Sequence, residues 1–214
     1  MREHQPLNLW LADDQQTRQA GAALAAALVP FAQSEPLVIF VRGDLGAGKS
    51  TLVRGFLSRA GVRGVMPSPT YSLVEPYQTD SLKIFHMDAY RLADAAELDY
   101  LGLDDIDAPG SILLVEWPDH IRNALPKPAL TVDLAMAARP EEGQFISVSS
   151  CASAESASVQ VEPASGSAAA ESVKAPGMRP VGRTLIVSVS GEPVDLYECL
   201  EASEEWEGLF RVVT

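Results

Sequence analysis

The residues best suited to chemistry lie in one short stretch, where residues 43–50 read Gly-Asp-Leu-Gly-Ala-Gly-Lys-Ser. This order fits G-x-x-x-x-G-K-[ST], the pattern of a loop that binds the phosphates of a nucleotide. The glycines let the backbone curl with its N–H groups toward a phosphate, and the helix that follows adds the partial positive charge of its N-terminus. We expect Lys49 to reach the β- and γ-phosphates and the Ser50 hydroxyl to bind Mg²⁺. The predicted nucleotide-binding residues are Gly43, Asp44, Leu45, Gly46, Ala47, Gly48, Lys49, Ser50 and Thr51.

Such a loop needs a strand before it and a helix after it, and the sequence predicts both. Residues 37–41 are an apolar, β-branched run typical of a buried strand. Residues 51–60 lack proline, place Leu52 and Phe56 at helical spacing, and are followed by Gly61 as a stop. The motif alone would arise by chance in roughly one chain of this length in a hundred. Because the flanking elements are also present, the sequence predicts nucleotide binding.

Two apolar segments end in a carboxylate, which a P-loop protein needs beside its loop to hold Mg²⁺ or the waters of Mg²⁺. One segment is Ile112-Leu-Leu-Val-Glu116 and the other is Lys83-Ile-Phe-His-Met-Asp88. A solvated carboxylate at a strand end is common in proteins. Finding two in a chain with a P-loop favours a role in the site, more strongly for Glu116 than for Asp88.

Helical and strand patterns alternate along the first 150 residues. Helices are expected over 15–29 and 93–101, besides the helix after the motif. Strands are expected over 71–76, 82–87, 112–115, 130–134 and 145–149, besides the strand before the motif. This alternation predicts an α/β domain over residues 1–150, with the three-layer P-loop NTPase fold and a mainly parallel sheet.

The composition changes near residue 150. Residues 151–180 are dominated by Ser and Ala with scattered Pro and Gly, which predicts a flexible linker because few large apolar side chains are available for burial. Residues 181–214 form an acidic C-terminal extension of unknown role, which contains a strand pattern starting at Thr184.

Charge and composition exclude several classes of protein. The formal net charge of the 214 residues is −13, which argues against a broad nucleic-acid surface of the chain's own. No apolar run approaches the roughly 20 residues of a membrane span, and the N-terminus lacks the apolar centre of a signal peptide. Cys151 and Cys199 lie far apart, so neither a disulfide framework nor a zinc site is expected. We expect a cytoplasmic protein without membrane contact.

Four segments occur together in a recognisable order and spacing: residues 43–51, 67–77 (Pro-Ser-Pro-Thr-Tyr-Ser-Leu-Val-Glu-Pro-Tyr), 86–92 (His-Met-Asp-Ala-Tyr-Arg-Leu) and 114–118 (Leu-Val-Glu-Trp-Pro). Over roughly residues 7–150 the chain resembles the TsaE (YjeE) family, P-loop ATPases of bacterial threonylcarbamoyladenosine biosynthesis. The resemblance implies an ATPase that depends on Mg²⁺ and acts with the TsaB–TsaD complex, which transfers the threonylcarbamoyl group to adenosine 37 of tRNA. It also implies that these partners stimulate hydrolysis and make the contacts with tRNA.

The resemblance further implies roles for single residues. Thr70 would approach the γ-phosphate and Mg²⁺, and Asp88 would orient water or metal for hydrolysis, so that both join Lys49 as catalytic residues. Glu116 would join Ser50 as a Mg²⁺ ligand. Thr17 would lie near the adenine end of the nucleotide.

The chain departs from the family pattern in two places. The family usually has Thr where this chain has Ser50, which keeps the hydroxyl. Family members also often carry a basic residue near the end of the domain that contacts nucleotide. Gln144 occupies that place and Arg139 is the nearest basic residue, so this contact is left unassigned.

Two other functions stay open on the residues alone. A small-molecule or nucleotide kinase of this fold usually has a lid with several Arg residues, whereas Arg91 is the only Arg between Tyr90 and Arg122. A nucleotide-gated interaction module, in which slow hydrolysis acts as a timer, differs from the ATPase only in whether partners raise its turnover.

Overall fold

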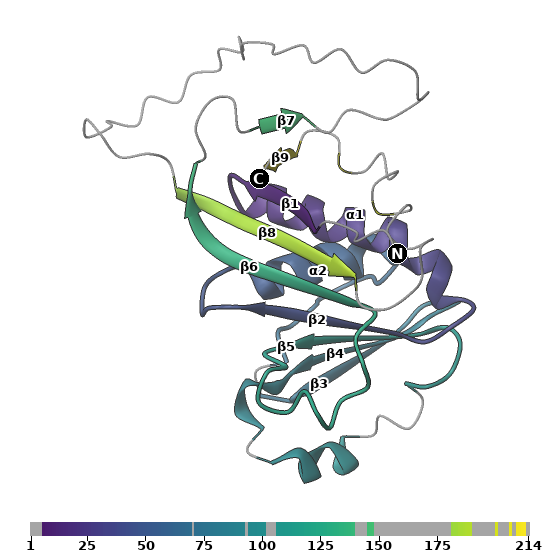
Figure 1. The fold of residues 1–214 in the computed structure, drawn as a ribbon. Helices are drawn as coiled ribbons and strands as arrows, with labels where there is room; N and C mark the ends of the chain where they lie inside the picture. The colour runs from purple at the N-terminus through teal and green to yellow at the C-terminus, as the bar shows by residue number, and fades with distance from the viewer. Residues whose placement is uncertain are drawn as a thin grey trace, which may run out of the picture.

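The computed structural model describes residues 6–69, 71–92, 94–101, 106–139, 145–147, 181–189, 200, 206 and 209–212. The strands are β1 (Leu7–Leu11), β2 (Leu37–Gly43), β3 (Val74–Gln78), β4 (Lys83–Asp88), β5 (Ser111–Glu116), β6 (Leu130–Ala138), β7 (Phe145–Ser147), β8 (Val181–Val189) and β9 (Phe210–Val212). The helices are α1 (Asp14–Ala32), α2 (Lys49–Arg59) and the short 3-10 helices η1 (Ala89–Arg91) and η2 (Ala95–Tyr100). The described strands form one nine-stranded sheet in the order β3-β4-β5-β2-β6-β8-β1-β9-β7 (Figure 1).

The centre of the sheet is parallel and its two sides are antiparallel. Strand β2 pairs in parallel with β5 and β6, and β4 pairs in parallel with β5. The remaining pairs, including β3–β4 and β6–β8, are antiparallel. The expected α/β fold is confirmed, but the sheet is mixed, and parallel pairing is confined to these central strands. One reason is that β3 and β4 are joined by a short turn, whereas parallel neighbours require a longer crossover.

Helices α1 and α2 pack side by side against one face of the sheet (Figure 1). Asp13 caps α1, because its carboxylate accepts a hydrogen bond from the backbone N–H of Gln16 at 2.8 Å. The two helices approach so closely that a Cβ atom at Gly21 would overlap the carbonyl oxygen of Leu52, and one at Gly55 would overlap that of Arg18. This packing fixes α2, and with it the loop at its N-terminus, against the sheet.

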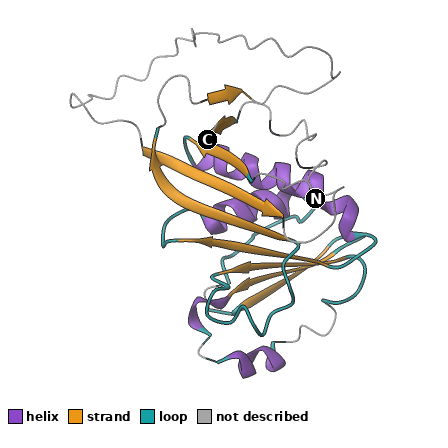
Figure 2. Cartoon of the chain, viewed as in Figure 1, coloured by secondary structure: helices purple, strands orange, loops and turns teal. Residues whose placement is uncertain are grey.

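The opposite face of the sheet is covered without an α-helix among the described residues. Phe40, Met87 and Val115 form a second buried cluster there, together with Ile121 and Leu125 from the segment after β5. The 3-10 helices lie apart from α1 and α2 (Figure 2). The helix expected over 93–101 is present as the short 3-10 helix η2 (Ala95–Tyr100), and the described part of the third layer consists of 3-10 helices, turns and loops.

Strand β8, from the expected C-terminal extension, lies inside the sheet between β6 and β1 and is antiparallel to both. Its register with β6 runs from Leu130↔Val189 to Ala138↔Val181. Further along the chain, Leu200, Trp206 and Leu209 are buried in the same core as α1 and α2. Residues beyond 180 thus contribute to the sheet and the core of the P-loop domain.

Several sequence predictions fall on residues that the structure does not describe. The expected linker over 151–180 and Thr70 lie outside the described residues, so both stay predictions; Gln144, to which no contact was assigned, also lies outside them. Within the described parts of the chain, no helix combines the length and the apolar character that crossing a membrane requires.

Candidate nucleotide site

The predicted phosphate loop connects β2 to α2. Strand β2 ends at Gly43 and α2 starts at Lys49, with Gly48 as its N-terminal cap. Gly43 has a φ of 138° and Gly48 a φ of 105°, values that residues with a side chain rarely adopt. A Cβ at Gly43 would also overlap the carbonyl oxygen of Leu134 on β6. The backbone N–H groups of the first turn of α2 have no acceptor within the helix, as an anion site requires.

Lys49 lies across this loop and is 5% exposed. Its Nζ donates hydrogen bonds to the carbonyl oxygens of Gly43 (2.7 Å) and Asp44 (2.9 Å), and lies 3.6 Å from the ring centroid of Trp117. Burial lowers the pKa of the Lys49 ammonium group, while the charge of Glu116 acts in the opposite direction. A phosphate oxygen that binds Lys49 would replace the carbonyl oxygens as acceptor.

Ser50, in the first turn of α2, and Glu116, at the end of β5, are in direct contact. The Ser50 hydroxyl donates to Oε2 of Glu116 at 3.1 Å, and the second oxygen, Oε1, lies 2.8 Å from Nε2 of His86. Glu116 is 2% exposed and His86 is 1% exposed. Hydroxyl and carboxylate oxygens are suitable donors for Mg²⁺, which in P-loop proteins is also bound by phosphates and waters. The donor set therefore fits Mg²⁺, although the described residues contain no group of three or more His, Cys, Asp and Glu that could hold a metal alone.

Asp88 lies next to Glu116, because β4 and β5 are parallel and the two residues are direct partners in the register. Its carboxylate accepts a hydrogen bond from the backbone N–H of Tyr90 at 3.0 Å. Burial raises the pKa of Asp88 above its ordinary value, and the nearby charge of Glu116 adds to this effect. A raised pKa makes this carboxylate a stronger base than an exposed aspartate, as the orientation or deprotonation of a water would require.

Thr17 is fully buried beside the phosphate loop. Its hydroxyl donates to the carbonyl oxygen of Asp13 at 2.8 Å, and its methyl carbon is 3.4 Å from the position that a Cβ at Gly48 would occupy. The side chain of Thr17 thus faces Gly48 of the phosphate loop.

Sequence reasoning missed Arg183, a basic residue at this loop. From β8, its Nη1 donates to the Thr17 hydroxyl at 3.4 Å and its Nη2 to the Asp14 carboxylate at 2.7 Å. Its Nε is buried, has no hydrogen-bond partner within the described parts of the chain, and lies 2.9 Å from the position that a Cβ at Gly48 would occupy. Arg139, the nearest basic residue to the expected place, instead lies 5.7 Å from the ring of Trp10. The strand pattern that starts at Thr184 was the available signal, because a closing strand there brings the preceding Arg183 to the domain.

The structure therefore brings most of the predicted site together. Around the loop lie Thr17, Lys49, Ser50, Asp88 and Glu116. Thr70 is not described, but the chain on either side of it is anchored near the site. Ser68 lies with its hydroxyl 3.5 Å from that of Ser50, and the carbonyl oxygen of Leu73 accepts from the backbone N–H of Asp88 at 2.9 Å.

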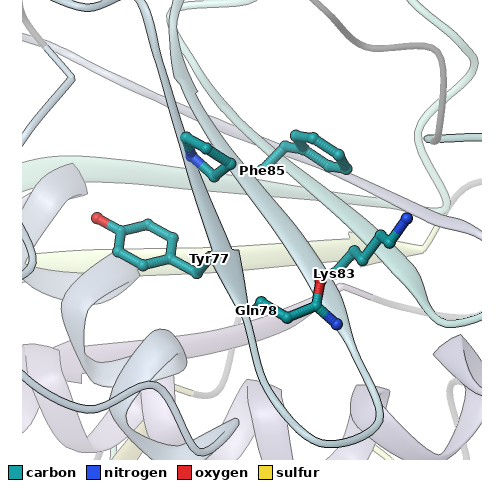
Figure 3. A pocket seen from close by; sticks show the side chains of 5 residues that line it. Tyr77, Gln78, Lys83 and Phe85 are labelled. Atoms are coloured by element: carbon teal, nitrogen blue, oxygen red, sulfur yellow. The ribbon is translucent and has the colours of Figure 1, made fainter.

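A separate cavity of about 390 Å³ lies on the β3–β4 hairpin. It is lined by Pro76, Tyr77, Gln78, Lys83 and Phe85, which Figure 3 shows around the two strands. None of the phosphate-loop residues lines it, so it is distinct from the candidate nucleotide site.

Comparisons with known proteins agree with this geometry. A family model described as "Threonylcarbamoyl adenosine biosynthesis protein TsaE" matches residues 11–143. The chain is 37% identical over 128 residues to "tRNA threonylcarbamoyladenosine biosynthesis protein TsaE" of Haemophilus influenzae. The matched region covers 60% of this chain and 81% of that protein. It is 36% identical over 104 residues to the protein of the same name from Bacillus subtilis, covering 49% of this chain and 65% of the relative.

Among solved structures, that of Bacillus subtilis YdiB is similar, with a TM-score of 0.50 and 21% sequence identity over 92% of this chain and 94% of that chain. At this identity the likeness supports the fold alone. The family match ends at residue 143, before β8 begins.

Proposed function

The chain belongs to the TsaE family of P-loop proteins, and from this premise we propose that it binds and hydrolyses ATP in the formation of N6-threonylcarbamoyladenosine in tRNA. The observation that carries the proposal is the meeting of Lys49, Ser50, Glu116 and Asp88 at one edge of the parallel strands, beside the first turn of α2. The relatives' names supply the pathway, since they assign those proteins to threonylcarbamoyladenosine biosynthesis.

Each residue of the site has a role that follows from its position. The loop backbone and Lys49 would bind the phosphates of ATP, with the Lys49 ammonium group exchanging the carbonyl oxygens of the loop for phosphate oxygens. The Ser50 hydroxyl and Glu116 would hold Mg²⁺, directly or through water, and bound Mg²⁺ would supply positive charge against the phosphates. Asp88 would orient the attacking water, and Thr70 would approach the γ-phosphate from the loop that follows Ser68.

Thr17 and Arg183 would complete the nucleotide site on its other side. Both lie against Gly48, and the buried Nε of Arg183 offers a donor that no described residue satisfies. We assign to Arg183 the basic contact with nucleotide that the sequence left open.

We propose TsaB and TsaD as the partners, in the cytoplasm. The net charge of −13 disfavours direct tRNA binding, so contact with tRNA would belong to the partners. The test is multiple-turnover tRNA modification by purified TsaB, TsaD and the enzyme that forms threonylcarbamoyl-AMP, with and without this chain. The proposal expects sustained modification only with the chain present, and equal turnover without it would refute the proposal. A phosphorylated acceptor in place of free phosphate would indicate a kinase instead.

A further inference from the structure

Glu116 is held from two sides by residues of different elements. Its Oε2 accepts a hydrogen bond from Ser50 on α2, and its Oε1 lies 2.8 Å from Nε2 of His86 on β4. The side chains of His86 and Glu116 are 1% and 3% exposed, so water contributes little to their solvation. A buried carboxylate without hydrogen-bond partners would be strongly destabilising, and His86 supplies one of the two described side-chain partners of Glu116.

The direction of this hydrogen bond follows from its partners. A carboxylate oxygen accepts, so the His86 nitrogen that faces it carries the hydrogen. The other ring nitrogen, Nδ1, is buried and has no hydrogen-bond partner among the described residues, so Nε2 is the ring nitrogen through which His86 contacts the described part of the chain. Because β4 is a strand, His86 and Asp88 point to the same face of the sheet.

We propose that His86 is a positioning residue of the magnesium site, which fixes the Glu116 carboxylate so that only Oε2, beside Ser50, is available for the metal. This inference rests on the proposed function, in which Ser50 and Glu116 hold Mg²⁺. The terminal torsion of a glutamate side chain is soft, so the carboxylate would rotate freely about it without the His86 hydrogen bond. Partners that orient a ligating side chain typically change metal affinity 10–100-fold when they are replaced.

The same contact bears on the choice of metal. Ca²⁺ accepts six to eight ligands and often takes both oxygens of one carboxylate, whereas Mg²⁺ requires octahedral geometry and usually takes one. Because Oε1 is hydrogen-bonded to His86, Glu116 can bind a metal through Oε2 alone without losing that hydrogen bond. His86 therefore favours Mg²⁺ over Ca²⁺ in this site.

The test compares His86→Leu, which removes the donor, with His86→Gln, whose amide nitrogen can reach the position of Nε2. Binding of a fluorescent ATP analogue is measured in EDTA and in titrations with Mg²⁺ and Ca²⁺. We expect equal binding of the three proteins in EDTA, an increase of about 10–100-fold in the Mg²⁺ concentration for half-saturation in His86→Leu, and a smaller increase in His86→Gln. In His86→Leu, the Mg²⁺ and Ca²⁺ concentrations that give half-saturation should become more similar than they are in the wild type.

An unchanged Mg²⁺ requirement in His86→Leu would overturn the inference. A loss of nucleotide binding in EDTA as large as the loss in Mg²⁺ would also overturn it, because it would indicate a merely structural role for His86. Should His86→Leu fold poorly, the pair His86→Gln and His86→Asn carries the test, because the shorter asparagine cannot reach Oε1 and should show the larger Mg²⁺ requirement. Equal requirements in that pair would overturn the inference. The two failures are distinguishable: loss of nucleotide binding by the wild-type chain would refute the proposed function, whereas a wild-type response in the variants would refute only the role of His86.

Discussion

At the scale of single residues, the site combines groups that local sequence reveals with one that it hides. Lys49, Ser50 and Glu116 belong to short motifs whose spacing dictates where the side chains go, and the structure places them together. Arg183 is separated from the phosphate loop by more than a hundred residues, and its place depends on the pairing of β8 with β1 and β6. The spacing of residues within a motif does not reveal pairing between distant strands, so the basic contact stayed unassigned in the sequence analysis, with Gln144 at the expected place and Arg139 as the nearest basic residue.

Replacement of Arg183 by methionine tests its assigned contact. Methionine keeps most of the apolar length but removes the donors, and hydrogen bonds to charged groups contribute about 1.5–3 kcal/mol. We expect ATP affinity, measured by isothermal titration calorimetry, to fall roughly tenfold or more. Arg139→Met is the matched control and should bind ATP like the wild type, because the Arg139 guanidinium lies 5.7 Å from the centroid of the Trp10 ring, where it can form a cation–π contact. Equal affinities for both variants would remove Arg183 from the nucleotide site.

The buried Asp88 predicts a dependence of stability on pH. Because burial raises its pKa in the folded protein above the ordinary value of 3.8, the folded state binds this proton more tightly than the unfolded state. The contribution to stability is fully present below 3.8 and is lost as pH rises through the elevated pKa. A difference of one in pKa corresponds to about 1.4 kcal/mol.

Asp88→Asn keeps an acceptor for the backbone N–H of Tyr90 and removes the buried charge. Urea unfolding should show a higher free energy of unfolding than the wild type at pH 7, with the difference shrinking toward pH 4, while ATP hydrolysis falls. A variant that is less stable at pH 7 would contradict the assignment of burial as the dominant cause.

At the scale of elements, the apolar runs of the sequence predicted the strands around the motif, and α1 and α2 lie where their periodicity indicated. The sequence did not indicate β1 (Leu7–Leu11), all five residues of which pair with β8, while Leu9 and Trp10 also pair with β9 on the other side. The helical pattern over 93–101 yielded only η2, which a capping box between Asp94 and Glu97 starts. Periodicity locates an element, but packing partners decide its final form.

The contact between α1 and α2 predicts an unusual response to a helix-favouring substitution. In an exposed helix, Gly→Ala stabilises by about 1 kcal/mol. At Gly55 of α2 the added Cβ would overlap the carbonyl oxygen of Arg18 in α1, so we expect Gly55→Ala to lower the free energy of unfolding by about 1–3 kcal/mol. Ser58→Ala, at an exposed position of the same helix, should leave it nearly unchanged in the same urea titrations. A stability gain for Gly55→Ala would show that the helices are not in such close contact.

At the scale of the whole molecule, strands from two separate parts of the sequence form the sheet of the P-loop domain. The family match ends at residue 143, yet the sheet continues with β8 from residue 181. The backbone pairs nine residues of β8 with nine of β6, and β1 covers the other edge of β8. The positions of β1 and β6 in the sheet therefore depend on β8, which belongs to the segment that the sequence analysis assigned to a C-terminal extension.

Cleavage between β6 and β8 tests this arrangement. Composition predicts that residues 151–180 form a linker, which a protease should cut first. After limited digestion we expect two fragments that coelute in size-exclusion chromatography and still bind ATP, because backbone hydrogen bonds hold β8 between β6 and β1. A chain truncated after residue 139 is the comparison and should lose both stability and ATP affinity. Separation of the two fragments without loss of binding would show that β8 is dispensable.

The most direct test of the central claim is the rate of ATP hydrolysis by the full chain, alone and with TsaB–TsaD added. The account predicts slow hydrolysis by the chain alone and strong stimulation by the pair. It also predicts loss of ATP binding in Lys49→Ala, and loss of Mg²⁺-dependent hydrolysis in Glu116→Ala. Hydrolysis that is unaffected by TsaB–TsaD, or that survives both substitutions, would contradict the account.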